Sequence, residues 1–546
     1  MPRAIVIRGG LVYDGSGRPP VEADLAISGD RIAAIGQGGD GSEEIDAGGL
    51  AVAPGFINML SWATESLIED GRGQSDLRQG VTLEVFGEGE SMGPLDERLT
   101  EELLRQQTNI RYDVEWTTLG EYLEYLQQRG VAPNVASFVG AATVRAHAMG
   151  YEDREPTTAE LEQMKRLVRA AMAEGAVGVG AALIYPPGCY AWTDELIELA
   201  RVAGEHEGLF TAHLRSEGDR LLEALDELIA IALAAPVRAE VHHLKAAGAA
   251  NWAKLERAIE KIEQARASGL SITANMYTYA ASGTGLTAGM PPWVQEGGFE
   301  VCRERLRDPD IRARVEAEMT APNEEWENLF LLAGPENIRF TEFASDELRP
   351  YTGRTLAEVA AERGLSPAQT AVQLVIEDGS RVEAAFFLMS EENVRRGVTL
   401  PWMSFCSDSI AAAPEGPFLQ LRPHPRAYGS FARLFGHYAR DERLVPLEEA
   451  IRRLTSLPAE NLHLRDRGRL RPGYFADVVV FDPATITDHA TFDEPHRYAS
   501  GVVHVLVNGV PVITSGEHTG ALPGRVVRGP GWQGRATSPD PGSAGA

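Results

Sequence analysis

The sequence predicts an α/β fold in which a (β/α)₈ TIM-like barrel is joined to a small β-sandwich domain formed by both chain termini. Short apolar runs alternate with longer helical stretches through most of the 546 residues, and eight such runs can be counted, the number that a closed barrel needs. Strand-like patterns return at both ends of the chain, which favours one β-domain built from the two termini. A chain of this length is also too long for a single core.

The N-terminal region alternates apolar and polar positions in short runs such as AIVIRGG and DLAISGD, the mark of successive hairpins. At Ala51 the pattern changes to AVAPGFINML, a continuous apolar run typical of a strand buried on both faces. We therefore assign residues 1–55 to the sandwich and residues 56–464 to the barrel. The candidate barrel strands lie at 56–60, 81–87, 135–140, 176–183, 208–213, 239–243, 270–275 and 401–407.

Helical patterns separate these strands. One covers Thr158 to Glu174, with Thr158 as the expected N-cap, and another covers Asp219 to Ala234. The gap before the eighth strand exceeds a hundred residues and holds charged helical segments at 302–319, 355–363 and 367–376. We expect an insertion at about 285–400, on the face where barrel enzymes bind substrate, where it could form a lid.

The C-terminal region regains strand character after a helix that starts at Pro446. The segment GYFADVVVFDP is followed by HVLVNGVPVI, in which Asn-Gly is a hairpin signal. Residues 465–530 are accordingly assigned to the sandwich. Residues 531–546 form a polar tail rich in Pro and Gly that we expect to be disordered.

Composition narrows the class of protein. A formal net charge of -28 argues against nucleic acid and anionic membranes as partners, because both would repel the chain. The three cysteines match neither a disulfide framework nor a zinc finger, and no signal peptide or apolar run of membrane-spanning length occurs. We expect a cytoplasmic enzyme, with the formation of a homo-oligomer left open.

Chemically capable side chains gather at the predicted strand ends. The residues at or just past those ends are Asn58, Glu88, Gly140, Tyr185, His213, His243, Tyr277 and Asp408. A Glu/His/His set leaves one position open for water, as a catalytic zinc site requires. Asp408 beside that water could take its proton and pass it to a leaving nitrogen, which is hydrolysis of an amide.

Each position also has a simpler interpretation. A single histidine in a strand is more often structural, and carboxylates such as Glu88 and Glu90 could be solvated loop residues. His242 should point away from His243 because strand side chains alternate, so a structural or supporting role is expected. Lys245 could be a surface cation or could meet an anionic substrate. Asp408 could be a helix cap or turn former, and Tyr185 could simply pack beside the prolines.

At these residues the sequence resembles the amidohydrolase superfamily, and within it the N-acyl-D-amino-acid deacylases (D-aminoacylases). The matching pieces are VAPGFI, QGVT, TVRAHAMG, LIYPPG, HLRSE, VHHLKAAGAANW, YTYAAS, SDS, HPRAYGSFARLFGHY, LTSLPAENL and GYFADVVVFDP. The resemblance implies a distorted barrel and metal-dependent removal of an acyl group from an N-acyl-amino acid. It makes His213 and His243 zinc ligands and Asp408 the general base. The positions that it gives to the substrate are Lys245, Arg426, Tyr185, Tyr277 and Ser282.

Two departures from the family pattern concern the metal. Relatives carry a His-x-His pair after the first strand, where this chain has Leu60 and Trp62, so that Trp62 would fill space that relatives leave for an imidazole. Relatives also use a cysteine ligand where this chain has Gly89, so an adjacent glutamate is expected to replace it, with Glu88 preferred because it is nearest the strand end. The positions left as supporting or uncertain are Glu90, His242, Arg215 and Trp62.

We expect one zinc ion per chain and a small anionic substrate. The leading hypothesis is a zinc-dependent amidohydrolase that cleaves the acyl amide of an N-acyl-D-amino acid or a similar carboxylate-bearing amide. The first alternative is a hydrolase of cyclic amides or of peptides that contain D-residues. The second alternative is an inactive binding protein that has kept the fold.

Overall fold

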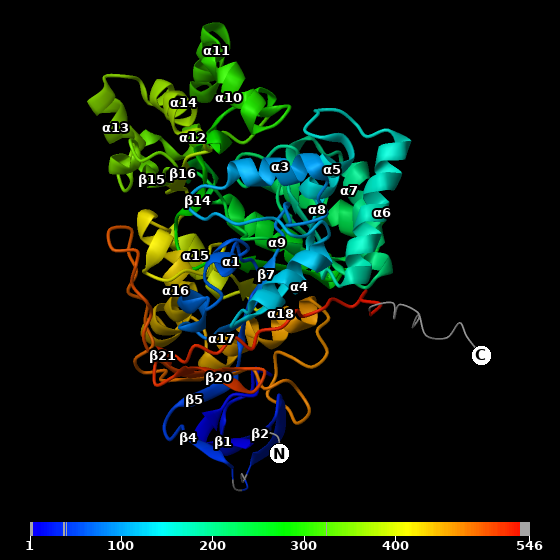
Figure 1. The fold of residues 1–546 in the computed structure, drawn as a ribbon, viewed down its shortest axis with the longest axis vertical. Coiled ribbons are helices and arrows are strands. Elements are labelled where there is room, and N and C mark those ends of the chain that lie inside the picture. Colours follow the sequence, from blue (N-terminus) through cyan, green and yellow to red (C-terminus); the bar gives the residue numbers. More distant parts are fainter. Residues whose placement is uncertain (1–3, 37–38, 40, 324, 535–546) are drawn as a thin grey trace, which may run out of the picture.

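The structure is a computed structural model that describes residues 4–36, 39, 41–323 and 325–534. Most of the predicted tail, from residue 535 onward, lies outside the described residues. Figure 1 shows three tiers, with the β-domain at the bottom, the barrel in the middle and a helical insertion at the top. None of the helices in the described part of the chain combines the length and apolarity needed to cross a bilayer.

The middle tier contains the eight predicted parallel strands. They are β6 (Phe56–Asn58), β7 (Val81–Phe86), β8 (Asn134–Ser137) continued by β9 (Val139–Gly140), β10 (Gly178–Ala182), β11 (Leu209–His213), β12 (Arg238–Val241), β13 (Ile272–Met276) and β17 (Met403–Phe405). Backbone bonds from Asp408 N to Leu60 O and from Trp62 N to Ser409 O, both 2.9 Å, join the segments after β6 and β17. The strands are buried on both faces, as a barrel covered by helices requires. The predicted fold class is confirmed.

Helices follow the strands along the chain, and they include those predicted at 158–174 and 219–234. They are α1 (Ser66–Glu69), α2 (Gln74–Leu77), α3 (Glu97–Gln106), α4 (Leu119–Arg129), α5 (Ala141–Met149), α6 (Thr158–Glu174), α7 (Thr193–Glu205), α8 (Leu221–Ala234), α9 (Lys254–Ala267), α16 (Arg426–Arg433), α17 (Leu447–Leu454) and α18 (Ser456–Asn461). The N-cap of α6 is Thr157, one residue before the predicted one, because Thr157 forms a capping box with Glu160. Helix α8 begins at Leu221, two residues later than predicted.

The long segment between β13 and β17 builds a small unit with its own core at the top of Figure 1. Its elements are β14 (Ser282–Gly285), α10 (Phe299–Arg307), α11 (Pro309–Thr320), α12 (Leu329–Ala333), β15 (Ile338–Glu342), α13 (Leu356–Arg363), α14 (Pro367–Asp378) and β16 (Glu383–Phe386). Helix α15 (Glu391–Val398) follows β16, and its Val394 and Val398 pack in the core of the barrel instead. The single helix predicted over 302–319 is wrong. Asp308 caps a new helix whose first residue is Pro309, and proline cannot continue the preceding one.

The two chain ends meet in one nine-stranded sheet. Its strands are β1 (Ala4–Val12), β2 (Val21–Ser28), β3 (Arg31–Gly36), β4 (Glu43–Asp46), β5 (Ala51–Pro54), β18 (Val478–Phe481), β19 (Val502–Val507), β20 (Val510–Thr514) and β21 (Glu517–His518). Antiparallel pairing of β5 with β18 joins the N-terminal strands to the C-terminal ones. The predicted Asn-Gly turn is confirmed, since Asn508 and Gly509 have φ of 50° and 76° between β19 and β20.

Candidate metal centre

Glu88, His213 and His243 form a buried cluster at the carboxyl ends of three strands. One ligand atom from each residue lies within 4.8 Å of the others. Oε1 of Glu88 lies 3.1 Å from Nδ1 of His213 and 2.6 Å from Nε2 of His243. Strands β7, β11 and β12 deliver the three side chains to one point because all barrel strands run parallel.

The backbone of His243 is bent to aim its ring at this point. Strand β12 ends at Val241, and His243 has a φ of 34°, an uncommon value for a residue with a side chain. The Asn275 side chain accepts the His243 backbone N–H at 2.8 Å, which holds the bend. This bend, rather than the simple strand alternation expected from the sequence, directs His243 toward Glu88.

Gly89 stands at the position where the sequence analysis expected an adjacent glutamate to replace a cysteine ligand. Its φ is 74°, and an added Cβ would lie 2.4 Å from Cβ and 2.8 Å from the backbone nitrogen of Ala182. No cysteine side chain fits at this position. Of the two adjacent glutamates, Glu88 reaches His213 and His243, whereas Glu90 is exposed.

Glu217 is a member of the site to which the sequence analysis gave no role. Its Oε1 lies 3.0 Å from Nδ1 of His243, and its Oε2 lies 3.4 Å from Nε2 of His213. Each imidazole thus has Glu88 on one nitrogen and Glu217 on the other. The motif HLRSE, which begins with His213, contains Glu217 and was the available signal.

The opposite charges of the carboxylates and imidazoles in this cluster offset the free-energy cost of burying them. Burial opposes ionisation of Glu88, but the charges and hydrogen bonds of His243 and His213 outweigh it and hold the pKa of Glu88 well below its usual value. Burial and the Lys245 ammonium oppose protonation of His243, yet Glu88 and Glu217 together raise its pKa to about 9. The site therefore stabilises carboxylates beside imidazoles.

Asp408 lies beside the cluster, where both of its oxygens accept hydrogen bonds. Nη1 of Arg426 donates to Oδ2 at 2.7 Å, and Nε1 of Trp62 donates to Oδ1 at 3.1 Å. The same indole N–H lies 3.2 Å from Oε2 of Glu88. Burial raises the pKa of Asp408, Arg426 opposes this shift and Glu88 adds to it. A carboxyl group with a raised pKa suits proton transfer near neutral pH.

Most of the residues that the sequence analysis assigned to substrate binding lie next to this cluster or to Asp408. The Arg426 guanidinium lies 4.5 Å from the centre of the Tyr277 ring, and the Tyr185 ring stands edge-on to His213 at 5.3 Å. Nζ of Lys245 lies 2.5 Å from Glu217 Oε1. Ser282 begins β14, and the next residue approaches Arg426 so closely that an added Cβ would be 3.3 Å from Nη2.

Besides Glu90, two more of the uncertain positions do not join the cluster. His242 accepts a hydrogen bond from Asn275 at 3.0 Å and is fully buried, and burial lowers its pKa to about 3. Arg215 pairs with Glu227 at 2.9 Å and donates to two carbonyl groups, so it ties the loop after β10 to α8. Both contribute to the scaffold.

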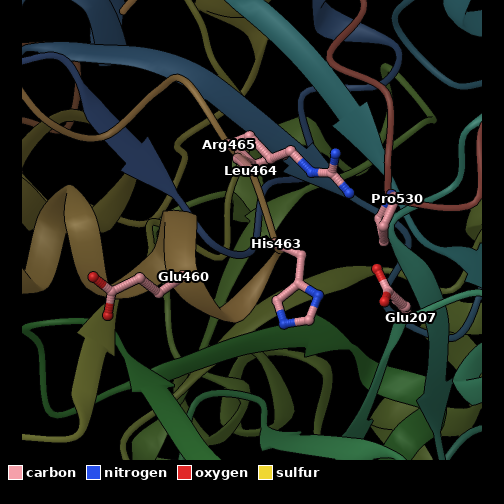
Figure 2. A pocket seen from close by; sticks show the side chains of 6 residues that line it. All are labelled: Glu207, Glu460, His463, Leu464, Arg465 and Pro530. Carbon is pink, nitrogen blue, oxygen red and sulfur yellow. The ribbon is translucent and has the colours of Figure 1, made fainter.

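A hollow of about 400 Å³ elsewhere is not this site. It is lined by Glu207, Glu460, His463, Leu464, Arg465 and Pro530, and Figure 2 shows its charged groups spread apart. Glu207 precedes β11, whose other end carries His213. The hollow therefore opens at the end of the barrel strands opposite to the cluster.

The donor set of the cluster fits zinc. One carboxylate oxygen and two imidazole nitrogens are ligands that zinc prefers, and three protein ligands leave a position for water or substrate. Glu217 on the remaining nitrogens matches the carboxylate that often orients metal-binding histidines. Together with Asp408, this arrangement at the strand ends of a barrel defines a metal-dependent hydrolase site.

Comparison with known proteins agrees with a metal-dependent hydrolase. The profile of the amidohydrolase family (Amidohydro_3) matches residues 43–513, and the chain belongs to this family. It is 34% identical over 535 residues to a D-aminoacylase of Alcaligenes xylosoxydans xylosoxydans, covering 96% of this chain and 98% of that one. It is similar to a solved N-acyl-D-glutamate deacylase of Bordetella bronchiseptica with zinc and a phosphonate inhibitor (TM-score 0.79, 32% identity, 97% and 100% covered).

A third relative is also a D-aminoacylase. The chain is similar to a solved D-aminoacylase described by its binuclear metal centre, with one-metal activation and second-metal attenuation. The TM-score is 0.78 at 31% identity, with 96% of this chain and 99% of that chain covered. The family resemblance expected from the sequence is thereby confirmed.

Proposed function

We propose that this protein is a zinc-dependent amidohydrolase that removes the acyl group from an N-acyl-D-amino acid or a similar amide bearing a carboxylate. The observation that carries this proposal is the buried Glu88, His213 and His243 cluster with Asp408 beside it. Support also comes from the deacylase relatives, which match nearly the full length of the chain.

Glu88, His213 and His243 would hold one zinc ion. Zinc bound there would polarise the scissile carbonyl and lower the pKa of a water molecule. Glu217 would keep both rings in the orientation and tautomer that present the correct nitrogen. Lys245 would neutralise Glu217, which it contacts at 2.5 Å, in addition to its proposed role toward the substrate.

Asp408 would move the proton. It would accept a proton from the attacking water and deliver it to the leaving nitrogen, so that the amide C–N bond breaks and a free amino acid is released. Its hydrogen bonds to Trp62 and Arg426 fix the carboxyl group in place for both steps.

Arg426 would bind the carboxylate of the substrate. Its Nη1 is used by Asp408, but its buried Nε has no hydrogen-bond partner among the described residues. A buried donor without a partner is costly, and a carboxylate placed there would satisfy it. Tyr277, Tyr185 and Ser282 would complete the walls around the substrate.

We also infer a cytoplasmic location and a small anionic substrate as partner. The location is supported by the three cysteines of the described chain, which are all free thiols. The acidic net charge of -28 supports the expectation that nucleic acid is not bound.

The test is a substrate panel measured with zinc-loaded protein. The panel contains N-acetyl-D-amino acids, their L-enantiomers, hydantoins and dipeptides, and the readout is release of the free amine or acid. We expect turnover of N-acetyl-D-amino acids at least tenfold faster than of the L-forms. Cleavage of cyclic substrates alone would support the first alternative, and protein that binds no zinc and cleaves nothing would support an inactive binding protein.

A further inference from the structure

The indole of Trp62 lies between the two carboxylates of the candidate centre. Its Nε1 is 3.2 Å from Oε2 of Glu88 and 3.1 Å from Oδ1 of Asp408. One N–H is therefore shared by two acceptors, which is a three-centre hydrogen bond. The partial positive charge on that hydrogen faces both carboxylate groups.

The surrounding backbone fixes this position. Trp62 N donates to Ser409 O and Asp408 N donates to Leu60 O, both at 2.9 Å, so the two segments lie against each other. Leu60 is buried beside Tyr277 and Cys406. The indole is consequently part of the site rather than a mobile surface side chain, although it is 36% exposed.

The two carboxylate oxygens of Glu88 make different contacts. Oε1 contacts His213 and His243, while Oε2 faces Trp62. Carboxylate oxygens of Asp and Glu bind zinc, and two-metal sites hold their ions about 3.5–4 Å apart, so two carboxylates that converge beside one metal position are suited to hold a second cation. Here the place between Glu88 and Asp408 is taken by an indole N–H, which donates a hydrogen bond and offers no lone pair to a metal.

We propose that Trp62 replaces a second cation and restricts the centre to one metal ion. This inference rests on the proposed function, because it assumes that Glu88, His213 and His243 bind the first ion. The indole supplies part of the positive potential that a cation would supply to Asp408 and Glu88, and its ring fills the volume. Trp62 is thus a positioning residue that sets metal stoichiometry, and it is expected to make the protein insensitive to excess zinc.

The experiment counts metal ions in the purified chain. Wild type, Trp62→His and Trp252→His are saturated with a tenfold excess of zinc, freed of unbound metal by gel filtration, and measured by mass spectrometry of the metal. Trp252 is a matched control, because it is 37% exposed and its indole donates to a backbone carbonyl, that of Leu388, at 2.8 Å. Circular dichroism verifies that each variant is folded.

We expect one zinc ion in wild type, two in Trp62→His and one in Trp252→His. A histidine at position 62 would add an imidazole to the carboxylates of Glu88 and Asp408 and so complete a second ligand set. Two ions in wild type, or one ion in folded Trp62→His, would overturn the inference. Absence of zinc from wild type would instead overturn the metal centre itself, a failure of the proposed function. If Trp62→His does not fold, the count is made on Trp62→Asn, whose shorter side chain vacates the place between Glu88 and Asp408: more than one ion is expected, and one ion in the folded variant would overturn the inference.

Discussion

Glu217 and Glu88 contact opposite nitrogens of the same His243 ring. Oε1 of Glu217 lies 3.0 Å from Nδ1, and Oε1 of Glu88 lies 2.6 Å from Nε2. The His213 ring is flanked in the same way, at 3.1 Å by Glu88 and 3.4 Å by Glu217. A metal bound with Glu88 would face one nitrogen of each ring, which leaves Glu217 to orient both rings from behind.

The first prediction concerns this orienting role. Glu217→Gln is expected to weaken zinc binding about 10- to 100-fold, the usual effect of removing a carboxylate that orients a metal-binding histidine. Competition with a chromogenic chelator measures the affinity. The exposed Glu223, on α8, provides the control, and Glu223→Gln should leave the affinity unchanged.

Glu217→Gln also deprives buried Lys245 of its counter-charge, so a loss of folding must be separated from a loss of metal binding. The double variant Glu217→Gln with Lys245→Met removes both charges. It should regain the melting temperature lost by the single variant while zinc binding stays weak. Recovery of full zinc affinity in the double variant would show that Glu217 does not orient the rings.

The second prediction distinguishes the two neighbouring glutamates. Glu88→Ala should reduce the zinc content from about one ion per chain to near zero, because Glu88 alone of the pair reaches His213 and His243. Glu90→Ala should keep the full content, since Glu90 is exposed. Metal analysis after dialysis against a weak chelator is the measurement, and equal loss in both variants would contradict the assignment.

Strand ends could be predicted from the sequence, and with them Glu88, His213, His243 and Asp408. The carboxyl ends of parallel strands converge in a barrel, so the last residues of separate apolar runs must meet. Glu217 could not be placed in this way, because it lies in the loop after β11, where no periodicity shows which way a side chain points.

Contacts that depend on local backbone bends could not be predicted from the sequence either. The φ of 34° at His243 and of 48° at Asp408 could not be predicted, because Asp and His adopt positive φ more often than other non-glycine residues but only in a small minority of cases. The bond between Arg426 and Asp408 joins the end of β17 to the start of α16, and its existence depends on how the intervening loop folds. Resemblance to the family supplied Arg426 and Ser282, which the strand pattern does not indicate, whereas the structure supplied the contacts of the site.

The third prediction concerns proton transfer. Asp408→Asn preserves the shape of the side chain and an acceptor for Arg426, but it cannot take up a proton from water. Zinc content should remain at the wild-type value while kcat falls by about 10²- to 10⁴-fold, the typical contribution of a general base. The measurements are metal analysis and the rate of N-acetyl-D-amino acid cleavage. A rate within fivefold of wild type would exclude Asp408 as the base.

The last prediction concerns the pH dependence of stability and arises in the insertion. Burial, with the nearby charge of Glu383 as the second cause, raises the pKa of Glu342 to about 7, although Thr108 and Asn109 donate hydrogen bonds to it. The pKa of Glu342 is about 4.5 in the unfolded chain and about 7 in the folded one. The stability that protonated Glu342 contributes to the fold is therefore fully present below pH 4.5 and is lost as the pH rises through about 7. Ionised Glu342 is therefore unfavourable at pH 9. Glu342→Gln stays neutral and retains an acceptor for both donors, so it should match wild type at pH 5.

At pH 9 the variant should be more stable than wild type by roughly 1 to 3 kcal/mol, because one pKa unit corresponds to about 1.4 kcal/mol and partial relaxation reduces the full effect. For a chain of this size that is a rise in melting temperature of about 2 °C. Scanning calorimetry at pH 5 and pH 9 measures the difference, with the exposed Glu347 replaced in Glu347→Gln as the control. The sign is the decisive result. If Glu342→Gln gained no more stability at pH 9 than at pH 5, the half-buried carboxyl group would be ionised in the folded protein at neutral pH, with its charge compensated by the two hydrogen-bond donors.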